Sequence, residues 1–361
     1  MTSLDQTTPR VAATCAQAFI KAALLTQGLA NEGADQVAKL MTEADMQGSD
    51  GHGIIRLPQY IKRLRSAGMN PRPIMRIVED RPATAVVDGD NGMGHLVVSH
   101  AVDIAIGKAR ECGVAWVGTR NSNHAGPASL YVRRALEHDM LALYFAVGNA
   151  NHLPPWGGMD MLLSTNPIAA AIPGAAEPPV VLDMATTVAA YGKVKARAKA
   201  GREMPVGWMI DRQGQPLTDP TRSEDGFLLP IGDHKGYGLA LVFGLLAGTL
   251  NGAAMGRNVV DFNADHVTPT NTGQTIIMVD LAAFGDVDAF KARVDQLERD
   301  IRDSERLPGV DRIWLPGEQS HAKRGAYAAA GYPISTGLLG ELDQLAADLG
   351  IAPLEIEGSR R

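Results

Sequence analysis

The sequence predicts a fold of the α/β class with α+β character, in which helices flank a mostly antiparallel mixed sheet. Three observations support this prediction. The first 70 residues show only helical spacing of apolar residues, whereas the strands and helices that follow mix without a strict βαβ rhythm. The Gly-x-Gly-x-x-Gly fingerprint that would indicate a Rossmann domain is absent.

The N-terminal part of the chain is predicted to be helical. Apolar residues recur at helical spacing in residues 11–25 and 31–46. A third helix is predicted over residues 58–67, because a proline is well tolerated in its first turn. Pro71 and Pro73 then end this region.

The remaining chain contains short apolar runs that predict strands and longer periodic runs that predict helices. Strands are expected over residues 84–88, 113–118, 140–147, 168–173, 180–183 and 275–280, and in a short run that ends at Trp314. Helices are expected over residues 97–112, 129–137, 184–198, 237–250, 287–302, 321–330 and 337–349. The helix over residues 237–250 is the most apolar, which suits a core or a subunit interface.

Length and composition are typical of a soluble enzyme. The chain has 361 residues, which suggests two or three compact units, and 45% of them are hydrophobic while 20% are charged. The formal net charge of −6 disfavours nucleic acid or an anionic membrane as the main partner, since both demand a basic surface. A local basic pocket for a small anionic substrate remains compatible with this charge.

Cysteine usage and the N-terminal segment predict a cytoplasmic protein. Cys15 and Cys112 lie in apolar helical stretches and belong to no CxxC pair, which favours buried free thiols in a reducing compartment. Residues 1–10 lack the basic-then-apolar plan of a signal peptide. No apolar run approaches the roughly 18–20 residues that span a bilayer.

The most informative segment surrounds His52. Glycines flank this histidine, so a ligand can approach the backbone closely on both sides, and Arg56 follows four residues later. Imidazole moves protons near neutral pH, and guanidinium binds a carboxylate through two parallel bonds. These are the two groups that the reduction of a 2-oxo acid needs, although a turn histidine followed by a surface arginine is an open alternative.

Two further polar segments follow predicted strands. His124 lies among small and amide-bearing residues, which fits either a ligand site or a polar helix cap. The amides of Asn121 and Asn123 could hold its ring in one tautomer. Asp183 stands where a strand is predicted to end and a helix to begin, so it could cap that helix or accept the hydroxyls of a cofactor ribose.

The last candidates are two lysines. Lys193 could be a buried cation for the substrate or a solvated side chain. Lys235, with glycine at position 236, enters the most apolar helix and resembles an anion-binding corner, although ordinary helix entry is the alternative. No HExxH motif, no Cys/His cluster and no close group of carboxylates indicates a metal, and the Gly-x-Ser-x-Gly motif of α/β-hydrolases is missing.

Together and in this order, these segments resemble the malate/L-lactate dehydrogenase family, which lacks a Rossmann fold. That family includes L-sulfolactate, ureidoglycolate and type-2 malate dehydrogenases, 2,3-diketo-L-gulonate reductase, and Δ1-piperideine-2-carboxylate/Δ1-pyrroline-2-carboxylate reductases. The resemblance runs from Gln36 to about Pro333 and rests on His52-Gly53 with Arg56-Leu57-Pro58 and Tyr60, Asn121-Ser122-Asn123-His124, Pro155-Trp156-Gly157-Gly158, Thr165-Asn166-Pro167, Leu182-Asp183-Met184-Ala185, Pro205-Val206-Gly207-Trp208, His234-Lys235-Gly236-Tyr237-Gly238-Leu239 and Pro316-Gly317-Glu318.

The resemblance implies a non-Rossmann fold with a helical N- and C-terminal domain, an obligate homodimer with active sites near the subunit interface, and NAD or NADP as cofactor. It divides the chain into a helical domain (1–75 with 335–361), a substrate and dimerisation region (76–115 with 286–334) and a cofactor-binding domain (116–285). The cofactor residues that it implies are His124, Ala125, Gly126, Ser164, Thr165, Asp183, Met184, Ala185, His234, Lys235, Gly236, Pro316, Gly317 and Glu318.

Three positions depart from the family pattern, and a fourth differs between members of the family. Gly51 replaces a serine that can orient the first histidine, so Asp50 or a water could take that role. Lys193 matches the hydroxy-acid dehydrogenases, whereas an imine reductase of the family has an acid there. Thr187 replaces a serine and keeps the hydroxyl, and His152 stands in a loop where an apolar residue is expected.

The predicted function is hydride transfer between NAD(P)H and C2 of a small 2-oxo acid, giving the L-2-hydroxy acid. His52 or His124 would donate the proton, Arg56 would hold the substrate carboxylate, and Lys193 could balance charge. Two alternatives stay open: reduction of a cyclic imine acid, and a cofactor-binding homologue with no competent active site.

Overall fold

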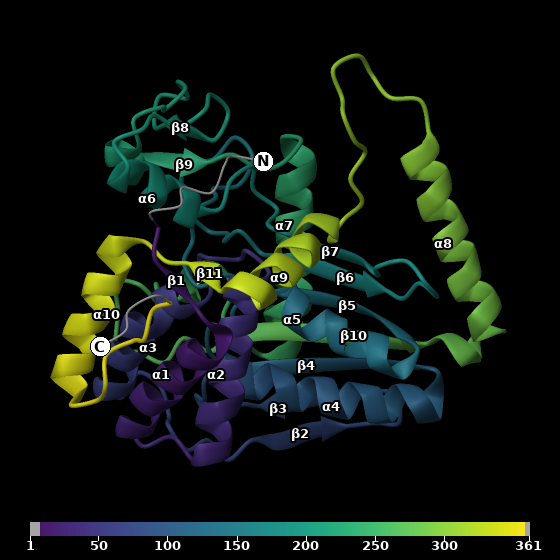
Figure 1. The fold of residues 1–361 in the computed structure, drawn as a ribbon, viewed down its shortest axis with the longest axis horizontal. Helices are drawn as coiled ribbons and strands as arrows, with labels where there is room; N and C mark the ends of the chain where they lie inside the picture. The colour runs from purple at the N-terminus through teal and green to yellow at the C-terminus, as the bar shows by residue number, and fades with distance from the viewer. Residues whose placement is uncertain (1–7, 358–361) are drawn as a thin grey trace.

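The three-dimensional structure is a computed structural model, and it describes residues 8–357. A seven-stranded sheet forms its centre, in the order β2-β3-β4-β10-β5-β6-β7 (Figure 1). Its strands are β2 (Arg76–Asp80), β3 (Thr84–Asp88), β4 (Val114–Ser122), β5 (Met140–Ala146), β6 (Ile168–Ile172), β7 (Val180–Met184) and β10 (Thr272–Asp280). Only the pairing of β3 with β4 is parallel, so the prediction of a mostly antiparallel sheet is confirmed.

Ten α-helices and two small sheets complete the described residues. The helices are α1 (Ala13–Thr26), α2 (Asn31–Met46), α3 (Leu57–Arg65), α4 (Gly94–Cys112), α5 (Ser129–Val132), α6 (Tyr191–Lys199), α7 (His234–Ala247), α8 (Val287–Asp303), α9 (Glu318–Ala330) and α10 (Thr336–Leu349). The small sheets pair β1 (Arg10–Val11) with β11 (Tyr332–Pro333), and β8 (Met209–Asp211) with β9 (Gly226–Leu228).

Helices cover both faces of the large sheet. Because side chains alternate between the faces of a strand, neighbouring residues of one strand belong to different cores. Val117 packs with Tyr144 and Met278 in the core under α4 and α5, whereas Phe145 and Ile277 pack in the core under α7. The apolar alternation of these strands therefore places the sheet between two helical layers.

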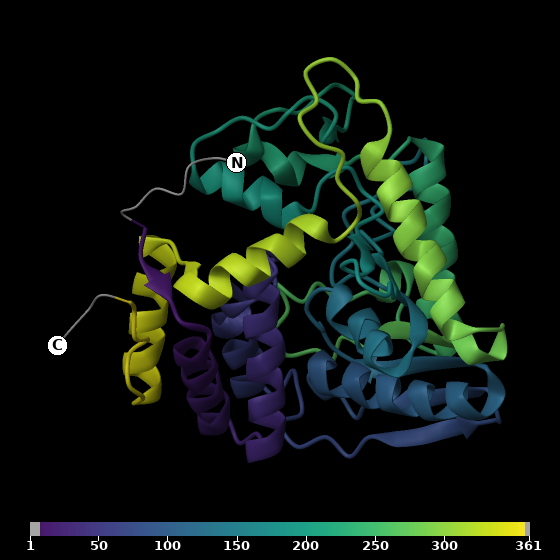
Figure 2. The ribbon, with the colours of Figure 1, turned by 45° about the vertical axis from the view of Figure 1, so that its right-hand side comes forward.

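The helices at the two ends of the chain form a second core beside the sheet. Its buried residues come from α1, α2, α3 and α10 and include Ile20, Met41, Leu57 and Leu342. Strand β11 pairs with β1, and α9 packs on α2 (Figure 2). The predicted division into three units remains a prediction, and residues 1–7 and 358–361 of its helical unit lie outside the described residues.

The predicted helix over residues 184–198 is wrong in its first half. Met184 is still the last residue of β7, and α6 begins only at Tyr191. Between them, Thr187 forms an isolated bridge with Pro230, and the amide of Val188 donates to the Leu229 carbonyl. This pairing with a distant segment satisfies the backbone and keeps it extended, which the local sequence does not reveal.

Two other predictions are corrected, and one strand was missed. No strand ends at Trp314, because the amide of the next residue, Leu315, donates to the Glu318 carboxylate instead of to a neighbouring strand. The two cysteines are not buried: Cys15 is half-buried, and Cys112 is exposed because it occupies the last turn of α4. The strand β2 was not predicted, because all five of its residues are exposed and carry no apolar alternation.

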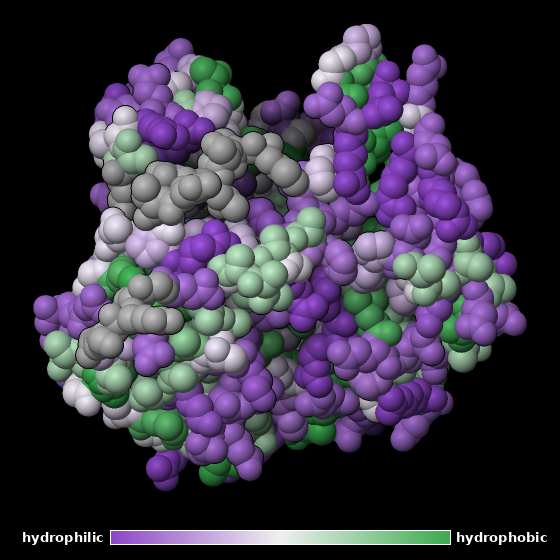
Figure 3. Space-filling model, viewed as in Figure 1, coloured by the Kyte–Doolittle hydropathy of each residue, from purple (hydrophilic) through white to green (hydrophobic). Residues whose placement is uncertain are grey.

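The face seen in Figure 1 has the polar surface that the composition predicts. That face is mainly hydrophilic, with small hydrophobic areas scattered over it (Figure 3). Among residues 8–357, no helix combines the length and the apolar character needed to cross a membrane.

Candidate active site

The first part of the site is a tight turn between α2 and α3. The amide of His52 donates to the Ser49 carbonyl over 2.8 Å, and a short 3-10 helix, Ile54–Arg56, follows directly. The Arg56 side chain folds back, so its Nε donates to the Gly51 carbonyl over 2.8 Å. The turn therefore holds the histidine and the arginine together, with both side chains half-buried.

The second part is the segment after β4, which carries His124. The Asn123 side-chain amide donates to the carbonyls of Asn91 and Gly92, and the Asn121 side-chain amide donates to the Asp88 carboxylate. These bonds fix the backbone around His124. The prediction that the two asparagines hold the His124 ring is therefore wrong, because their amides are used elsewhere.

The two predicted histidines meet in the structure. His52 Nδ1 lies 3.2 Å from His124 Nε2, and the rings are nearly parallel, with 13° between their planes. The hydroxyl of Tyr60 forms a short hydrogen bond with His124 Nδ1. Both ring nitrogens of His124 are thus engaged, whereas Nε2 of His52 has no hydrogen-bond partner among residues 8–357. The result is a chain of three side chains that ends at His52.

Burial dominates the electrostatics of this cluster. Burial and the nearby charge of Arg56 lower the pKa of His52 to about 4. Burial, followed by the charges of His52, Arg56 and His95, holds the pKa of His124 well below its ordinary value. Burial raises the pKa of Tyr60 well above its ordinary range. The free protein therefore carries two neutral imidazoles and a neutral phenol at neutral pH.

Arg56 lies close enough to the two histidines for its charge to act on both. Its Nη1 donates to the Asn263 side chain over 3.1 Å, and Nη2 makes no hydrogen bond within the described part of the chain. Asn263 belongs to a loop that follows α7 by many residues, so nothing in the sequence near Arg56 indicated it. The loop amide fixes one edge of the guanidinium and leaves another edge for a ligand.

Two cluster residues were missed as site residues. Tyr60 marked the family resemblance but received no role, although its spacing of four from Arg56 on a helix was a usable signal. His95 lies at the start of α4, is fully buried, and stands edge-on to the Tyr60 ring. Neither His95 ring nitrogen has a hydrogen-bond partner, and burial lowers the pKa of His95 to about 3.

A second group of predicted residues is joined by backbone hydrogen bonds. The Thr186 amide donates to the Thr165 carbonyl over 2.9 Å, and the Ile231 amide donates to the Thr186 carbonyl over 3.0 Å. The Gly236 amide in the first turn of α7 then donates to the Ile231 carbonyl over 2.8 Å. The structure thereby brings the segments that contain Ser164, Thr165, Met184, Ala185, His234, Lys235 and Gly236 side by side.

Asp183 connects this group to the segment after His124. Its Oδ2 accepts the Ser129 amide at the start of α5 over 2.8 Å. It therefore caps a helix 54 residues earlier in the chain, not the helix expected to follow it. Ala125 and Gly126 lie in the chain between His124 and α5. Desolvation raises the pKa of the Asp183 carboxyl.

The segment at residues 316–318 lies along the edge strand β7. The Val181 amide donates to the Pro316 carbonyl over 3.0 Å. Gly317 has a φ of +92°, and a side chain there would come within 3.0 Å of Val181, so glycine is required. The Glu318 carboxylate is already bound, because Arg302 Nε donates to it over 2.8 Å and the Leu315 amide over 3.0 Å.

Two lysines stand apart from the buried cluster. Lys193 on α6 and Lys235 on α7 are both exposed, and neither side chain forms a hydrogen bond or ion pair with another described residue. The structure does not bring Lys193 into contact with His52, His124 or Arg56. The described residues also contain no group of three or more potential metal ligands.

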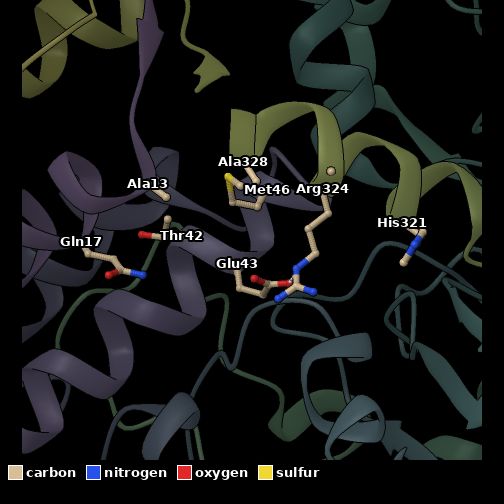
Figure 4. Close-up of a pocket in the computed structure, with 9 residues that line it drawn as sticks. Ala13, Gln17, Thr42, Glu43, Met46, His321, Arg324 and Ala328 are labelled. Carbon is tan, nitrogen blue, oxygen red and sulfur yellow. Dashed lines mark ion pairs between the residues drawn. The ribbon is translucent and has the colours of Figure 1, made fainter. Parts of the chain in front are cut away.

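A separate cavity of about 300 Å³ lies between α1, α2 and α9 (Figure 4). Glu43 and Arg324 form an ion pair of 2.7 Å on its wall. None of the predicted site residues lines this cavity, so it is distinct from the histidine cluster.

Comparison with known proteins identifies close relatives. The family described as malate/L-lactate dehydrogenase matches residues 11–343. The malate dehydrogenase of Pyrococcus abyssi is 34% identical over 351 residues, which cover 94% of this chain and 94% of that protein. The solved sulfolactate dehydrogenase of Methanocaldococcus jannaschii superimposes with a TM-score of 0.88 at 35% identity, covering 95% of this chain and 98% of that one. A solved Δ1-piperideine-2-carboxylate reductase from Pseudomonas syringae has a TM-score of 0.81 at 30% identity, covering 94% and 100%.

Proposed function

The chain belongs to the malate/L-lactate dehydrogenase family and is an oxidoreductase of CH–OH groups. On that premise we propose that it interconverts a small 2-oxo acid and the L-2-hydroxy acid, and we assign the residues that carry the reaction. The observation that carries the proposal is the chain from Tyr60 through His124 to His52, with Arg56 beside its open end. The substrate is a small anion, which fits a single guanidinium next to a proton donor.

Arg56 binds the substrate carboxylate. Its Nε and Nη1 are held by Gly51 and Asn263, so the guanidinium plane is fixed before substrate arrives. A fixed plane allows two parallel hydrogen bonds to a carboxylate and sets which face of C2 is presented for reaction. The conformational entropy of the arginine is then lost on folding instead of on binding.

The two histidines act as one acid–base unit, and His52 faces the substrate. The Tyr60 hydroxyl keeps its own proton because its pKa is so high, and it donates to His124 Nδ1. The His124 proton then lies on Nε2 and is directed at His52 Nδ1. Among the described residues, Nε2 of His52 is the one nitrogen of the pair without a hydrogen-bond partner. When the pair carries an extra proton, this nitrogen passes a proton to the substrate oxygen in the reducing direction, and both imidazoles return to the neutral form.

Substrate binding prepares this proton transfer. In the free protein, the charge of Arg56 helps to keep the His52 imidazole neutral. A bound carboxylate compensates that charge, so it raises the pKa of the pair. The imidazolium, the form that can donate, is then populated when the substrate is in place.

The second group of residues fits a nicotinamide dinucleotide, NAD or NADP. The 14-residue helix α7 presents its N-terminus with His234 and Lys235, which suits a diphosphate, and the Asp183 carboxylate suits ribose hydroxyls. Further contacts are proposed from His124, Ala125, Gly126, Ser164, Thr165, Met184, Ala185, Gly236, Pro316, Gly317 and Glu318. The bound nicotinamide supplies the hydride in reduction and accepts it in oxidation.

The backbone around Gly317 also suits the proposed binding of a nicotinamide dinucleotide. Gly317 approaches the β7 backbone closely, and the Glu318 carboxylate is engaged inside the chain. We therefore propose that residues 316–318 contact the cofactor through their backbone, and that the bound Glu318 carboxylate holds this backbone in place. Lys193 is kept as a solvated cation that balances the charge of an incoming anion.

A homodimer with active sites near the interface is part of the proposal. Leu239, Val242 and Leu245 on α7 are 37%, 51% and 43% exposed, so an apolar helix face lies open beside the Lys235 corner. A second copy of the chain would bury it. The free cysteines, Cys15 and Cys112, agree with a reducing compartment such as the cytoplasm.

Reduction of a cyclic imine acid is the second candidate, because a solved relative carries that activity in its name. Arg56 would hold the same carboxylate, and the proton from His52 would reach nitrogen instead of oxygen. The third possibility, a protein that binds cofactor without catalysis, is disfavoured by the assembled histidine pair.

The experiment is a substrate panel with the purified protein. NADH and NADPH are each offered with pyruvate, oxaloacetate and the five- and six-membered cyclic imine acids, and the absorbance of the reduced cofactor is followed. We expect one 2-oxo acid to exceed both imines by at least about tenfold in kcat/KM, a difference of about 1.4 kcal/mol. The His52→Ala variant should lose this turnover. The control His138→Ala should keep it, because His138 ends a 3-10 helix and its ring bonds to Arg110 instead of to a predicted site residue.

The outcomes separate the three candidates. Faster turnover of an imine would replace the main proposal with the second candidate. Cofactor binding, measured by fluorescence, with no turnover of any acid would leave only a binding protein.

A further inference from the structure

Asp45 reaches from α2 into the turn that carries His52. It is the second-last residue of the helix, it is 4% exposed, and its Oδ2 accepts the Ile54 amide over 2.8 Å. Ile54 stands midway between His52 and Arg56 in the sequence. The carboxyl group therefore binds the backbone between the two residues that the proposed reaction needs.

Gly53 shows how closely the turn approaches this carboxyl group. A Cβ atom at position 53 would lie 1.9 Å from Asp45 Oδ1 and 2.3 Å from Oδ2, which no side chain tolerates. The sequence context suggested only that this glycine gives a ligand access to the backbone. In the structure, the glycine is also needed for the close contact between the backbone and Asp45. The backbone of the turn thus packs directly against the carboxyl group.

The other hydrogen bonds of the turn are local. The Gly48 amide donates to the Asp45 carbonyl, the Ser49 amide to the Ala44 carbonyl, and the His52 amide to the Ser49 carbonyl. These bonds shape the first half of the turn, but none of them joins the part from Gly53 onward to α2. The Asp45 side chain supplies the hydrogen bond that fixes this second half to α2.

Burial keeps Asp45 uncharged near neutral pH. Burial raises the pKa of Asp45 to about 8, the Ile54 amide opposes this, and the charge of Asp50 adds to it. Tyr332 on β11 also faces the carboxyl group, and Lys323 on α9 faces Asp50. A neutral carboxylic acid still accepts the Ile54 amide, so the contact does not require a charge.

We propose that Asp45 is a positioning residue. Its hydrogen bond with the Ile54 amide and its contact with Gly53 set the positions of His52 and Arg56. The inference rests on the function proposed for His52 and Arg56. Loss of the carboxyl group lets the turn shift, which lengthens the 3.2 Å contact between His52 and His124 and turns the guanidinium away from its ligand. Misplacement by about 1 Å is enough to lower a rate by about 10²-fold.

The first test compares two substitutions at one position. Asp45→Asn keeps the shape and an oxygen acceptor for Ile54, so kcat/KM should stay within about threefold of the parent protein. Asp45→Ala removes the acceptor, so kcat/KM should fall about 10²-fold, while the Kd of NADH or NADPH measured by fluorescence stays within about twofold. Asp35→Ala is the matched control, because Asp35 lies on the same helix but pairs with surface lysines.

The second test does not use turnover. Hydrogen exchange at the Ile54 amide, followed by mass spectrometry of a peptide across residues 52–56, should be at least about tenfold faster in Asp45→Ala than in Asp45→Asn. This measurement is informative even if the panel of acids shows no activity, so failure of the proposed function and failure of this inference are distinguishable. Equal exchange in the two variants would overturn the inference.

A third variant, Gly53→Ala, tests the same contact and by itself does not depend on a folded Asp45→Ala protein. Its methyl group would overlap the Asp45 carboxyl group, so kcat/KM should fall about 30-fold, an effect smaller than removal of a catalytic group. In the Asp45→Ala background the methyl group has room, so the same change should cost less than about threefold. Multiplicative effects of the two substitutions, or an Asp45→Ala enzyme with the parent kcat/KM, would refute the role of Asp45.

Discussion

The histidine cluster and the region around Lys235 differ in how their polar side chains are engaged. Tyr60, His124 and His52 bind one another in a buried chain with shifted pKa values. Lys235 and Lys193, in contrast, have exposed side chains, and backbone hydrogen bonds hold together the segments around Lys235.

This contrast follows from what each region has to do. Proton transfer needs groups held at fixed distances in a site of low dielectric constant. Binding of a charged ligand needs donors that are not already used. Substitutions in the cluster should therefore lower kcat, whereas substitutions near Lys235 should weaken binding.

The largest effect is expected at the two histidines. His52→Ala and His124→Ala should each lower kcat by at least about 10²-fold at saturating substrate, the low end for loss of a general acid. The double variant should be much less than multiplicatively worse, because both residues act on one proton path. A single variant with near-normal kcat would assign that histidine to binding or structure and leave the other as the donor.

Arg56 lies beside the histidine cluster but is proposed to bind a ligand, so its substitution tests the distinction between proton transfer and binding. Arg56→Lys keeps the charge but loses the planar fork, so kcat/KM should fall about 10- to 100-fold, mainly through a higher KM for the acid. Cofactor affinity should remain unchanged. Arg65→Lys, an exposed arginine at the end of the same helix, is the control, and a lysine variant with the parent kcat/KM would rule out Arg56 as the carboxylate clamp.

The opposite pattern is expected at Lys235. Lys235→Ala removes one charge-assisted hydrogen bond to the proposed diphosphate, so the KM for the cofactor should rise about tenfold while kcat stays within about twofold. Steady-state kinetics with varied cofactor test this, with Lys39→Ala on α2 as a surface control. A fall in kcat with an unchanged cofactor KM would break the distinction between the two regions.

The smallest expected effect is on the pH profile. Oxidation of the hydroxy acid needs a neutral imidazole, and the pKa of His52 in the free protein is lowered to about 4. The kcat/KM for oxidation reports the free protein, so it should vary less than about twofold from pH 6 to 8 and decline only as His52 becomes protonated at lower pH. A decline centred near 6.5, the ordinary pKa of histidine, would show that burial does not act on this residue as the structure indicates.

Much of the fold could be predicted because it depends on local periodicity. The helix expected over residues 31–46 and the strand expected over residues 84–88 have those bounds in the structure. The helix over residues 184–198 was mispredicted because Thr187 and Val188 pair with a segment that begins some 40 residues later. Local sequence cannot reveal a partner at that distance.

The same distinction holds for the site. The sequence by itself determined the fold class and singled out His52, Arg56 and His124, because glycine-flanked and amide-rich turns are local features. Only the tertiary structure decided which groups they meet: Tyr60 on His124, Asn263 on Arg56, and Asp45 beneath Gly53. Hydrogen bonds between distant segments depend on how helices and strands pack, and packing is a property of the whole chain.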